Sequence, residues 1–172
     1  RTVDPFFVGH ENQRSQGQDE YPYLITNRGS LEQVNAWRIE AGMDPIPMTR
    51  FRPNIVIDID PFEEDNIAVL SIPEKGIKMR LVKPCARCQI INVNQETGVS
   101  EAQDRSQALL PLLAKHRTFK NAQGKLGTMF GQNAIIIKGA DKEISVGDVL
   151  KIQWKKYEPT PADDQNRILD RL

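Results

Sequence analysis

Cysteine and histidine are scarce in this sequence, and their scarcity excludes several kinds of site. The 172 residues include 2 cysteines and 2 histidines. Two cysteines cannot form the disulfide framework of a small secreted domain, so a reducing compartment is expected. A structural zinc site needs four protein ligands, and neither His10 nor His116 has ligand spacing to the cysteines. A metal site in this chain must therefore use few protein ligands.

The sequence also lacks an excess of charge of either sign. Lys and Arg number 23, Asp and Glu number 23, and the formal net charge is +0. The two signs are mixed along the chain and no basic stripe stands out, which argues against a nucleic-acid-binding protein. Mixed charges of this kind are typical of an ordinary soluble surface.

Long apolar runs are lacking as well, and no signal peptide is visible in the residues given. No apolar run approaches the roughly 18 residues that a membrane-spanning helix needs. The chain begins with Arg1, and we expect a processed protein or an excised domain in the bacterial cytoplasm. We expect residues 1–18 to form an irregular linker, residues 19–157 a single domain, and residues 158–172 a Pro-rich tail.

Short segments of alternating apolar residues dominate what is present. They predict about seven strands and about two helices. Short turns join successive strands, which favours an antiparallel sheet or barrel over βαβ units. The expected fold class is therefore mainly β with a few helices. The predicted strands are residues 21–26, 54–60, 67–72, 77–81, 89–93, 133–138 and 149–154.

Two segments carry a helical pattern. Ser30 and Gln33 have capping-box spacing, so we expect the first helix to have Ser30 as its N-cap and to end near Gly42. The second helix is predicted over residues 106–117, with Pro111 in its first turn. The inner face of the first helix is predicted to carry Leu31, Val34 and Trp37.

Both cysteines lie in one short motif, Pro84-Cys85-Ala86-Arg87-Cys88. A thiolate is a soft metal ligand and a good nucleophile, and an adjacent guanidinium favours the ionised sulfur. A thioredoxin-like dithiol normally opens a helix, whereas a strand is predicted after this motif. One metal-binding thiolate beside one structural cysteine fits the pattern better. Two buried structural cysteines are the alternative.

A second cluster, Arg50-Phe51-Arg52-Pro53-Asn54, combines charge with a fixed backbone. Proline restricts the residue before it, so Arg52 is expected to be extended. The guanidinium suits phosphate or carboxylate, and the amide of Asn54 can donate and accept hydrogen bonds. A surface loop whose arginines pair with the carboxylates of residues 63–65 is an equally good interpretation.

Two further features have competing interpretations. Gly131 lies within Phe130-Gly131-Gln132-Asn133 and permits either a close approach of the backbone to a ligand or an ordinary turn before a strand. His116 lies in the second predicted helix. A histidine there is expected to be a packing or surface residue rather than a catalytic base.

Taken in order, these segments resemble the MOSC domain, the family named for the C-terminal domain of molybdenum cofactor sulfurase. The branch that fits best is that of the mitochondrial amidoxime-reducing component and its bacterial relatives. The F-R-P-N and C-x-R-C elements together are specific, whereas either alone is weak. The matching stretches are residues 19–25, 30–31, 50–56, 62–65, 85–88, 94–98, 130–133 and 146–148.

The resemblance implies a β-barrel-like MOSC fold that holds a molybdenum cofactor, a molybdopterin. Cys88, the second cysteine of C-x-R-C, would be the protein ligand to molybdenum and the catalytic residue. Arg52, Asn54 and Arg87 would contact the pterin or its phosphate, and Arg87 would also help keep the thiol of Cys88 ionised. Three further residues would line the same site: Asp19, Tyr21 and Asn133.

The resemblance also implies an activity and partners. The activity is the two-electron reduction of N-hydroxylated small molecules, with an electron-transfer protein or an iron–sulfur domain as the partner. Pyridoxal phosphate binding is a further family-level expectation. The family's N-terminal β-barrel domain, which adds basic contacts to the cofactor phosphate, and the cysteine set of an iron–sulfur domain are missing from this sequence. The alternatives are a module that carries cofactor or sulfur to a partner enzyme and a non-catalytic interaction domain.

Overall fold

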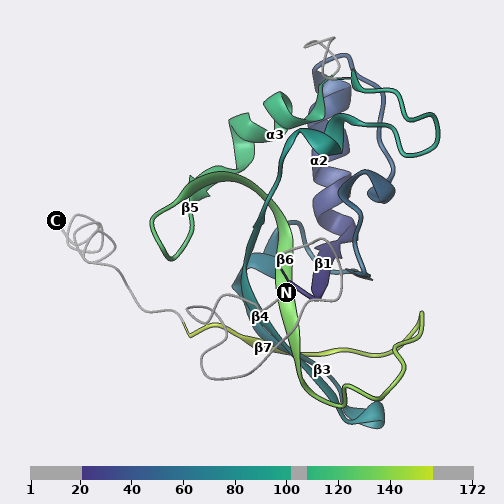
Figure 1. Ribbon diagram of the computed structural model, residues 1–172, viewed down its shortest axis with the longest axis vertical. Coiled ribbons are helices and arrows are strands. Elements are labelled where there is room, and N and C mark those ends of the chain that lie inside the picture. The colour runs from purple at the N-terminus through teal and green to yellow at the C-terminus, as the bar shows by residue number, and fades with distance from the viewer. Residues whose placement is uncertain (1–20, 102–107, 157–172) are drawn as a thin grey trace, which may run out of the picture.

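The computed structural model describes residues 21–101 and 108–156, and these residues form a mainly β fold with two α-helices (Figure 1). This confirms the predicted fold class. The strands are β1 (Tyr23–Asn27), β2 (Ile55–Ile57), β3 (Ile67–Ile72), β4 (Ile77–Ala86), β5 (Thr118–Lys120), β6 (Leu126–Lys138) and β7 (Lys151–Trp154). The helices are α2 (Arg28–Glu40) and α3 (Leu109–Arg117), with short 3-10 helices η1 (Met48–Phe51), η2 (Glu63–Asn66), η3 (Pro73–Lys75) and η4 (Gln89–Asn92).

The strands belong to one curled sheet. Its order is β2-β1-β6-β4-β3-β7, and β5 pairs with β6 beside this path. Every pairing is antiparallel except that of β1 with β2, which is parallel. A parallel pair needs a crossover connection, and α2 provides it. The predicted antiparallel sheet is therefore confirmed except at this pair, where one βαβ unit occurs.

The alternating apolar residues of the strands form one hydrophobic cluster. Ile77, Met79 and Leu81 of β4 are all buried, as their spacing predicts. Ile57 of β2 is buried in the same cluster, and Ile55 and Ile59 pack against it. The period-2 pattern thus correctly predicted which face of these strands is buried.

A second hydrophobic cluster lies between the helices and the sheet. It joins Val34 of α2, Phe51 of η1 and Phe130 of β6 to buried leucines of α3. Leu31 and Trp37 pack against it, which confirms the predicted inner face of α2. The rings of Phe51 and Phe130 stack with their centroids 3.7 Å apart. This contact fixes the C-terminal end of η1 against the middle of the sheet.

Strand β6 begins at Leu126, well before the predicted start at Asn133, and passes close to β1 at Gly131. Gly131 has a φ of 75°. A Cβ atom there would lie 2.7 Å from the carbonyl oxygen of Ile25, closer than such atoms can approach. Glycine is thus required by an approach of two backbones, and Gly131 does not form a turn before the strand.

The predicted N-cap of the first helix is wrong. Asn27 caps α2, and its side-chain oxygen accepts a hydrogen bond from the backbone N–H of Gly29 at 3.1 Å. Ser30 lies inside the helix, where its hydroxyl donates to the carboxylate of Glu64 at 2.8 Å and accepts from the N–H of Phe62 at 2.8 Å. A tertiary contact with a buried carboxylate therefore uses the hydroxyl that local spacing assigned to the cap.

The strand predicted at residues 89–93 is also wrong, because this segment forms the 3-10 helix η4. Ile91 and Asn92 are both fully buried. Ile91 belongs to the second hydrophobic cluster, and packing within that cluster outweighs the local strand pattern. The side-chain oxygen of Asn92 accepts a hydrogen bond from the N–H of Leu110 at 2.9 Å, which holds the start of α3.

Arg52 is not extended, contrary to the prediction. It follows η1 with φ 54° and ψ 49°, in the left-handed region, and its N–H donates to the carbonyl of Thr49 at 3.0 Å. A left-handed residue commonly ends a helical turn. At Arg52, the hydrogen bond that closes this turn outweighs the preference of a residue before proline for an extended backbone.

No helix within residues 21–101 and 108–156 is long and apolar enough to cross a membrane. Helix α3 has Pro111 in its first turn, as predicted, while the predicted start of that helix at residue 106 lies outside the described residues. The predicted linker at residues 1–18, residue Asp19 and the predicted tail at residues 158–172 also lie outside them. The proposed domain bounds stay a prediction.

Candidate functional site

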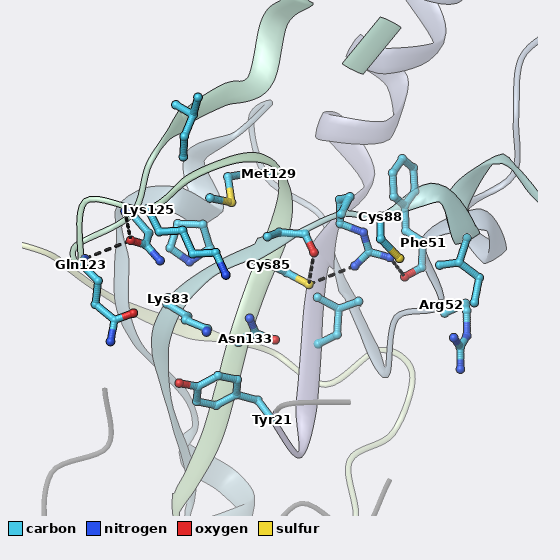
Figure 2. A pocket seen from close by; sticks show the side chains of 17 residues that line it. Tyr21, Phe51, Arg52, Lys83, Cys85, Cys88, Gln123, Lys125, Met129 and Asn133 are labelled. Carbon is cyan, nitrogen blue, oxygen red and sulfur yellow. Dashed lines mark hydrogen bonds between the residues drawn. The ribbon is translucent and has the colours of Figure 1, made fainter. Parts of the chain in front are cut away.

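A cavity of about 440 Å³ opens beside the cysteine motif (Figure 2). Small-molecule sites commonly have volumes of about 300–1,000 Å³. Its walls come from the end of β4 and the cysteine motif, the end of η1, the chain around β1, β6 and the hairpin between β5 and β6. The lining residues are Tyr21, Leu24, Phe51, Arg52, Lys83, Pro84, Cys85, Ala86, Arg87, Cys88, Ile90, Asn121, Gln123, Lys125, Leu126, Met129 and Asn133.

Backbone pairing places the cysteine motif on the cavity wall. Ala86, the last residue of β4, pairs with Met129 of β6. The N–H of Arg87 donates to the carbonyl of Thr128 at 2.7 Å, and the chain then leaves the sheet so that Cys88 becomes the N-cap of η4. Cys88 is exposed for this reason, whereas Cys85, still within β4, is half-buried.

The arginine of the motif contacts one sulfur only. Arg87 Nη1 donates to Cys85 Sγ at 3.1 Å. Both cysteines are free thiols, and no residue in the described part of the chain donates a hydrogen bond to the sulfur of Cys88. Sequence reasoning paired Arg87 with Cys88. The structure pairs it with Cys85, because residues two apart in an extended chain point to the same side.

Arg87 also joins the motif to η1. Its Nη2 donates to the carbonyl oxygen of Phe51 at 2.7 Å, and its Cζ lies 5.7 Å from the centre of the Phe51 ring. Its Nε is buried without a hydrogen-bond partner. Arg87 is therefore a fixed cation in the cavity wall, with one donor group left unsatisfied.

Arg52, the other arginine of the cavity, is exposed and makes no ion pair or hydrogen bond through its side chain with any residue from 21–101 or 108–156. In Figure 2 it lies beside Phe51 and Cys88, on one side of Cys85. Its guanidinium is thus available to a ligand, whereas that of Arg87 is held by the protein.

The structure rejects the interpretation in which these arginines pair with residues 63–65. Arg50 is buried, with 2% of its surface exposed, and forms an ion pair with Glu101. Glu64 accepts hydrogen bonds from Ser30 and Asn27, and Asp65 forms an ion pair with Arg117. The carboxylates of Glu64 and Asp65 are therefore engaged by other residues and do not pair with this arginine cluster.

The charge of the cavity is of one sign. Four cationic side chains line it, those of Arg52, Lys83, Arg87 and Lys125, and its described lining has no Asp or Glu. The whole chain has a formal net charge of +0, so this positive charge is a local feature. A concave site with charge of one sign concentrates ligands of the opposite sign. The cavity therefore favours an anionic ligand.

Five of the seven predicted site residues line this cavity: Tyr21, Arg52, Arg87, Cys88 and Asn133. Asn133 is 8% exposed and Tyr21 is 2% exposed. Asn54 does not line it, because its side-chain oxygen accepts from the N–H of Leu24 at 2.7 Å and thereby joins η1 to β1. Asp19 lies outside the described residues. The roles of all seven toward a cofactor stay predictions.

Sequence reasoning missed the residues that the β5–β6 hairpin brings to the cavity. Lys125, Gln123 and Asn121 lie in its loop, and Lys83 precedes the cysteine motif on β4. The segment Asn-Ala-Gln-Gly-Lys at residues 121–125 has the composition of a turn, so the loop itself could have been predicted. Its position opposite the cysteines depends on the pairing of β6 with β4, which no local pattern encodes.

Comparisons with known proteins place the chain in a family. The family model for the MOSC domain matches residues 12–151. Molybdenum cofactor sulfurase of Drosophila mojavensis is 33% identical over 145 residues, which cover 84% of this chain and 17% of that protein. Mitochondrial amidoxime-reducing component 1 of Homo sapiens is 30% identical over 131 residues, which cover 76% of this chain and 36% of that protein. The chain thus spans well under two thirds of these relatives, and it belongs to the MOSC domain family.

Proposed function

We propose that this MOSC domain binds a molybdenum cofactor and forms part of an oxidoreductase that reduces N-hydroxylated small molecules. The observation that carries the proposal is the exposed thiol of Cys88 on a cavity with four cationic side chains and no carboxylate in its described lining. The names of two relatives, molybdenum cofactor sulfurase and amidoxime-reducing component, concern this cofactor and this kind of substrate.

The residues of the cavity fit such a group. A thiolate is a suitable ligand for a soft metal, and Cys88 offers one that no described residue engages. A phosphate is bound well by a planar guanidinium, which Arg52 presents without a described protein partner. The orphaned Nε of Arg87 and the amide of Asn133 add hydrogen-bonding groups that a pterin could satisfy.

The proposal gives each residue a separate task. Cys88 would hold the metal, Arg52 would bind the pterin or its phosphate, and Arg87 would hold η1 and the cysteine motif together beside the site. When bound, the cofactor supplies two-electron redox chemistry that no side chain provides. Phe51 and the exposed Ile90 would exclude water from one side of the cavity. Asn54, Asp19 and Tyr21 stay as predicted contacts.

Further protein would complete the enzyme. The chain spans 18% of the Drosophila melanogaster sulfurase and 36% of the human amidoxime-reducing component. We propose that an N-terminal β-barrel domain would add contacts to the cofactor phosphate, and that an electron-transfer protein or an iron–sulfur domain would be the electron-donating partner. The two free thiols fit a reducing compartment such as the bacterial cytoplasm. Pyridoxal phosphate binding stays a family-level expectation.

Metal analysis tests the proposal. The longest natural form of the protein is co-expressed with cofactor-synthesising enzymes, and molybdenum and pterin are measured per protein. Wild type should carry both, Cys88→Ser should lose at least nine tenths of the molybdenum, and Cys85→Ser should keep most of it, because only Cys88 is exposed on the cavity. Equal loss in both variants would point to a dithiol site and contradict the assignment to Cys88.

The exposure of Cys88 also favours a second function, that of a module carrying sulfur or cofactor to a partner enzyme. An exposed thiol to which no described residue donates a hydrogen bond is open to a partner's active site. A persulfide on Cys88 in intact-protein mass spectra, without molybdenum in the same sample, would favour this function. A sample with neither would favour a non-catalytic interaction domain.

A further inference from the structure

The hairpin between β5 and β6 forms one wall of the cavity. The proposed function assigns no role to the residues of this wall. The two strands pair from Thr118 opposite Thr128 to Lys120 opposite Leu126, and residues 121–125 form the loop. Asn121, Gln123 and Lys125 of this loop line the cavity. In Figure 2, Gln123 and Lys125 lie on one side of Cys85, while Cys88 and Arg52 lie on the other.

The loop is held in shape by one side chain. The side-chain oxygen of Asn121 accepts from the backbone N–H groups of Gln123 and Lys125, both at 3.0 Å. The carbonyl of Asn121 also accepts from the N–H of Gly124 at 2.8 Å, and Gly124 has a φ of 75°. Because the loop backbone is fixed in this way, a ligand would not have to order it on binding.

The hairpin end of the cavity is cationic. The ammonium group of Lys125 makes no ion pair or hydrogen bond with a residue of the described ranges. Lys83 reaches the same cavity from β4, with its Nζ 4.9 Å from the centre of the Tyr21 ring. Figure 2 shows both lysine side chains reaching toward the middle of the cavity. Two ammonium groups on one concave wall bind an oxyanion more strongly than either alone.

We propose that Lys125 and Lys83, with the amide of Asn121, form an oxyanion subsite for a phosphate or a carboxylate at the hairpin end of the cavity. The subsite lies away from Arg52 and Cys88, so one ligand can occupy both ends, with its anionic group on the lysines and another group beside the sulfur. The anionic group belongs either to an N-hydroxylated substrate or to the cofactor, and this assignment alone rests on the proposed function.

Phosphate binding by the purified protein tests the subsite without any cofactor. Inorganic phosphate is titrated at constant ionic strength, and binding is followed by NMR shifts of the lysine side chains and by calorimetry. Lys125→Ala should weaken binding about tenfold, and Lys125→Arg should preserve it. Lys120→Ala is the matched control, because Lys120 is an exposed lysine of the same hairpin outside the cavity. No binding by wild type, or equal weakening in the Ala variants at 120 and 125, would overturn the subsite.

A second pair of measurements identifies the source of the anion. If the lysines hold the cofactor phosphate, Lys125→Ala should lower the cofactor content of co-expressed protein. If the lysines hold the substrate, Lys125→Ala is compared with wild type at equal cofactor content. The ratio of KM for a carboxylated benzamidoxime to KM for benzamidoxime should then be about tenfold higher in Lys125→Ala. If Lys125→Ala carries cofactor and is active, and neither its cofactor content nor its KM ratio differs from wild type, the subsite would be overturned. Protein that binds phosphate through Lys125 but never carries molybdenum would support the subsite and refute the proposed function.

Discussion

Replacement of Arg87 by methionine would separate the structural task of this arginine from its charge. Methionine keeps an unbranched apolar stem over the Phe51 ring but removes the donor to the Phe51 carbonyl at 2.7 Å and the donor to Cys85 Sγ at 3.1 Å. The matched control is Arg52→Met. It removes the same charge from the same cavity, but Arg52 has no side-chain partner among the described residues.

The magnitude follows from the two hydrogen bonds that Arg87 donates. A hydrogen bond with one charged partner contributes about 1.5–3 kcal/mol, and a sulfur acceptor contributes less. Loss of both should therefore lower the free energy of unfolding by about 2–3 kcal/mol, a fall in Tm of about 4–12 °C for a domain of this size. Arg52→Met should change the free energy of unfolding by less than about 0.5 kcal/mol.

Urea denaturation and thermal melting of the two variants and wild type provide the assay, with equal m-values as the check that the same transition is compared. If Arg87→Met were no less stable than Arg52→Met, Arg87 would not connect the cysteine motif to η1 as argued. Cofactor content is a second measurement, because Arg52→Met should lose cofactor while its free energy of unfolding stays close to that of wild type. This pairing tells a binding defect from a folding defect.

Two further predictions concern buried groups away from the cavity. Burial raises the pKa of Glu64 more than hydrogen bonds from Ser30 and Asn27 lower it. The folded protein therefore binds the carboxyl proton of Glu64 more tightly than the unfolded chain does. The protonated Glu64 stabilises the fold fully below the ordinary pKa of 4.5, and this stabilisation is lost as the pH rises through the raised pKa. Glu64→Gln should flatten that fall in urea denaturation measured across pH, and an equally steep fall in the variant would contradict the cause given. Gly131→Ala should lower the free energy of unfolding by about 2–4 kcal/mol, because its Cβ would lie 2.7 Å from the Ile25 carbonyl oxygen. Gly98→Ala, with a φ of 70° and nothing within 4 Å of the Cβ, should cost only about 1 kcal/mol, and similar losses at the two glycines would refute the close approach.

The candidate site shows how far local sequence reasoning reaches. The chemistry of Cys88, Arg87 and Arg52 follows from residue type and from two short motifs, and the structure brings all three to one cavity. The partner of Arg87 was assigned to the wrong sulfur, because the side of the chain on which each cysteine lies depends on where β4 ends. Asn54 was grouped with the ligand contacts although its side chain binds the backbone of β1, thirty residues earlier in the sequence.

The sequence by itself determined the mainly β class, the buried faces of β4 and α2, the turn between β3 and β4, and the family. Each of these depends on periodicity, turn residues or motifs that a few neighbouring residues carry. Only the tertiary structure decided that Ser30 donates a hydrogen bond to Glu64 instead of capping the helix. The 3-10 helix at residues 89–92 and the position of Lys125 on the same cavity as Cys88 were also decided only there. These outcomes depend on which partners the sheet brings together across the chain, and the free energy of those distant contacts outweighs local preference.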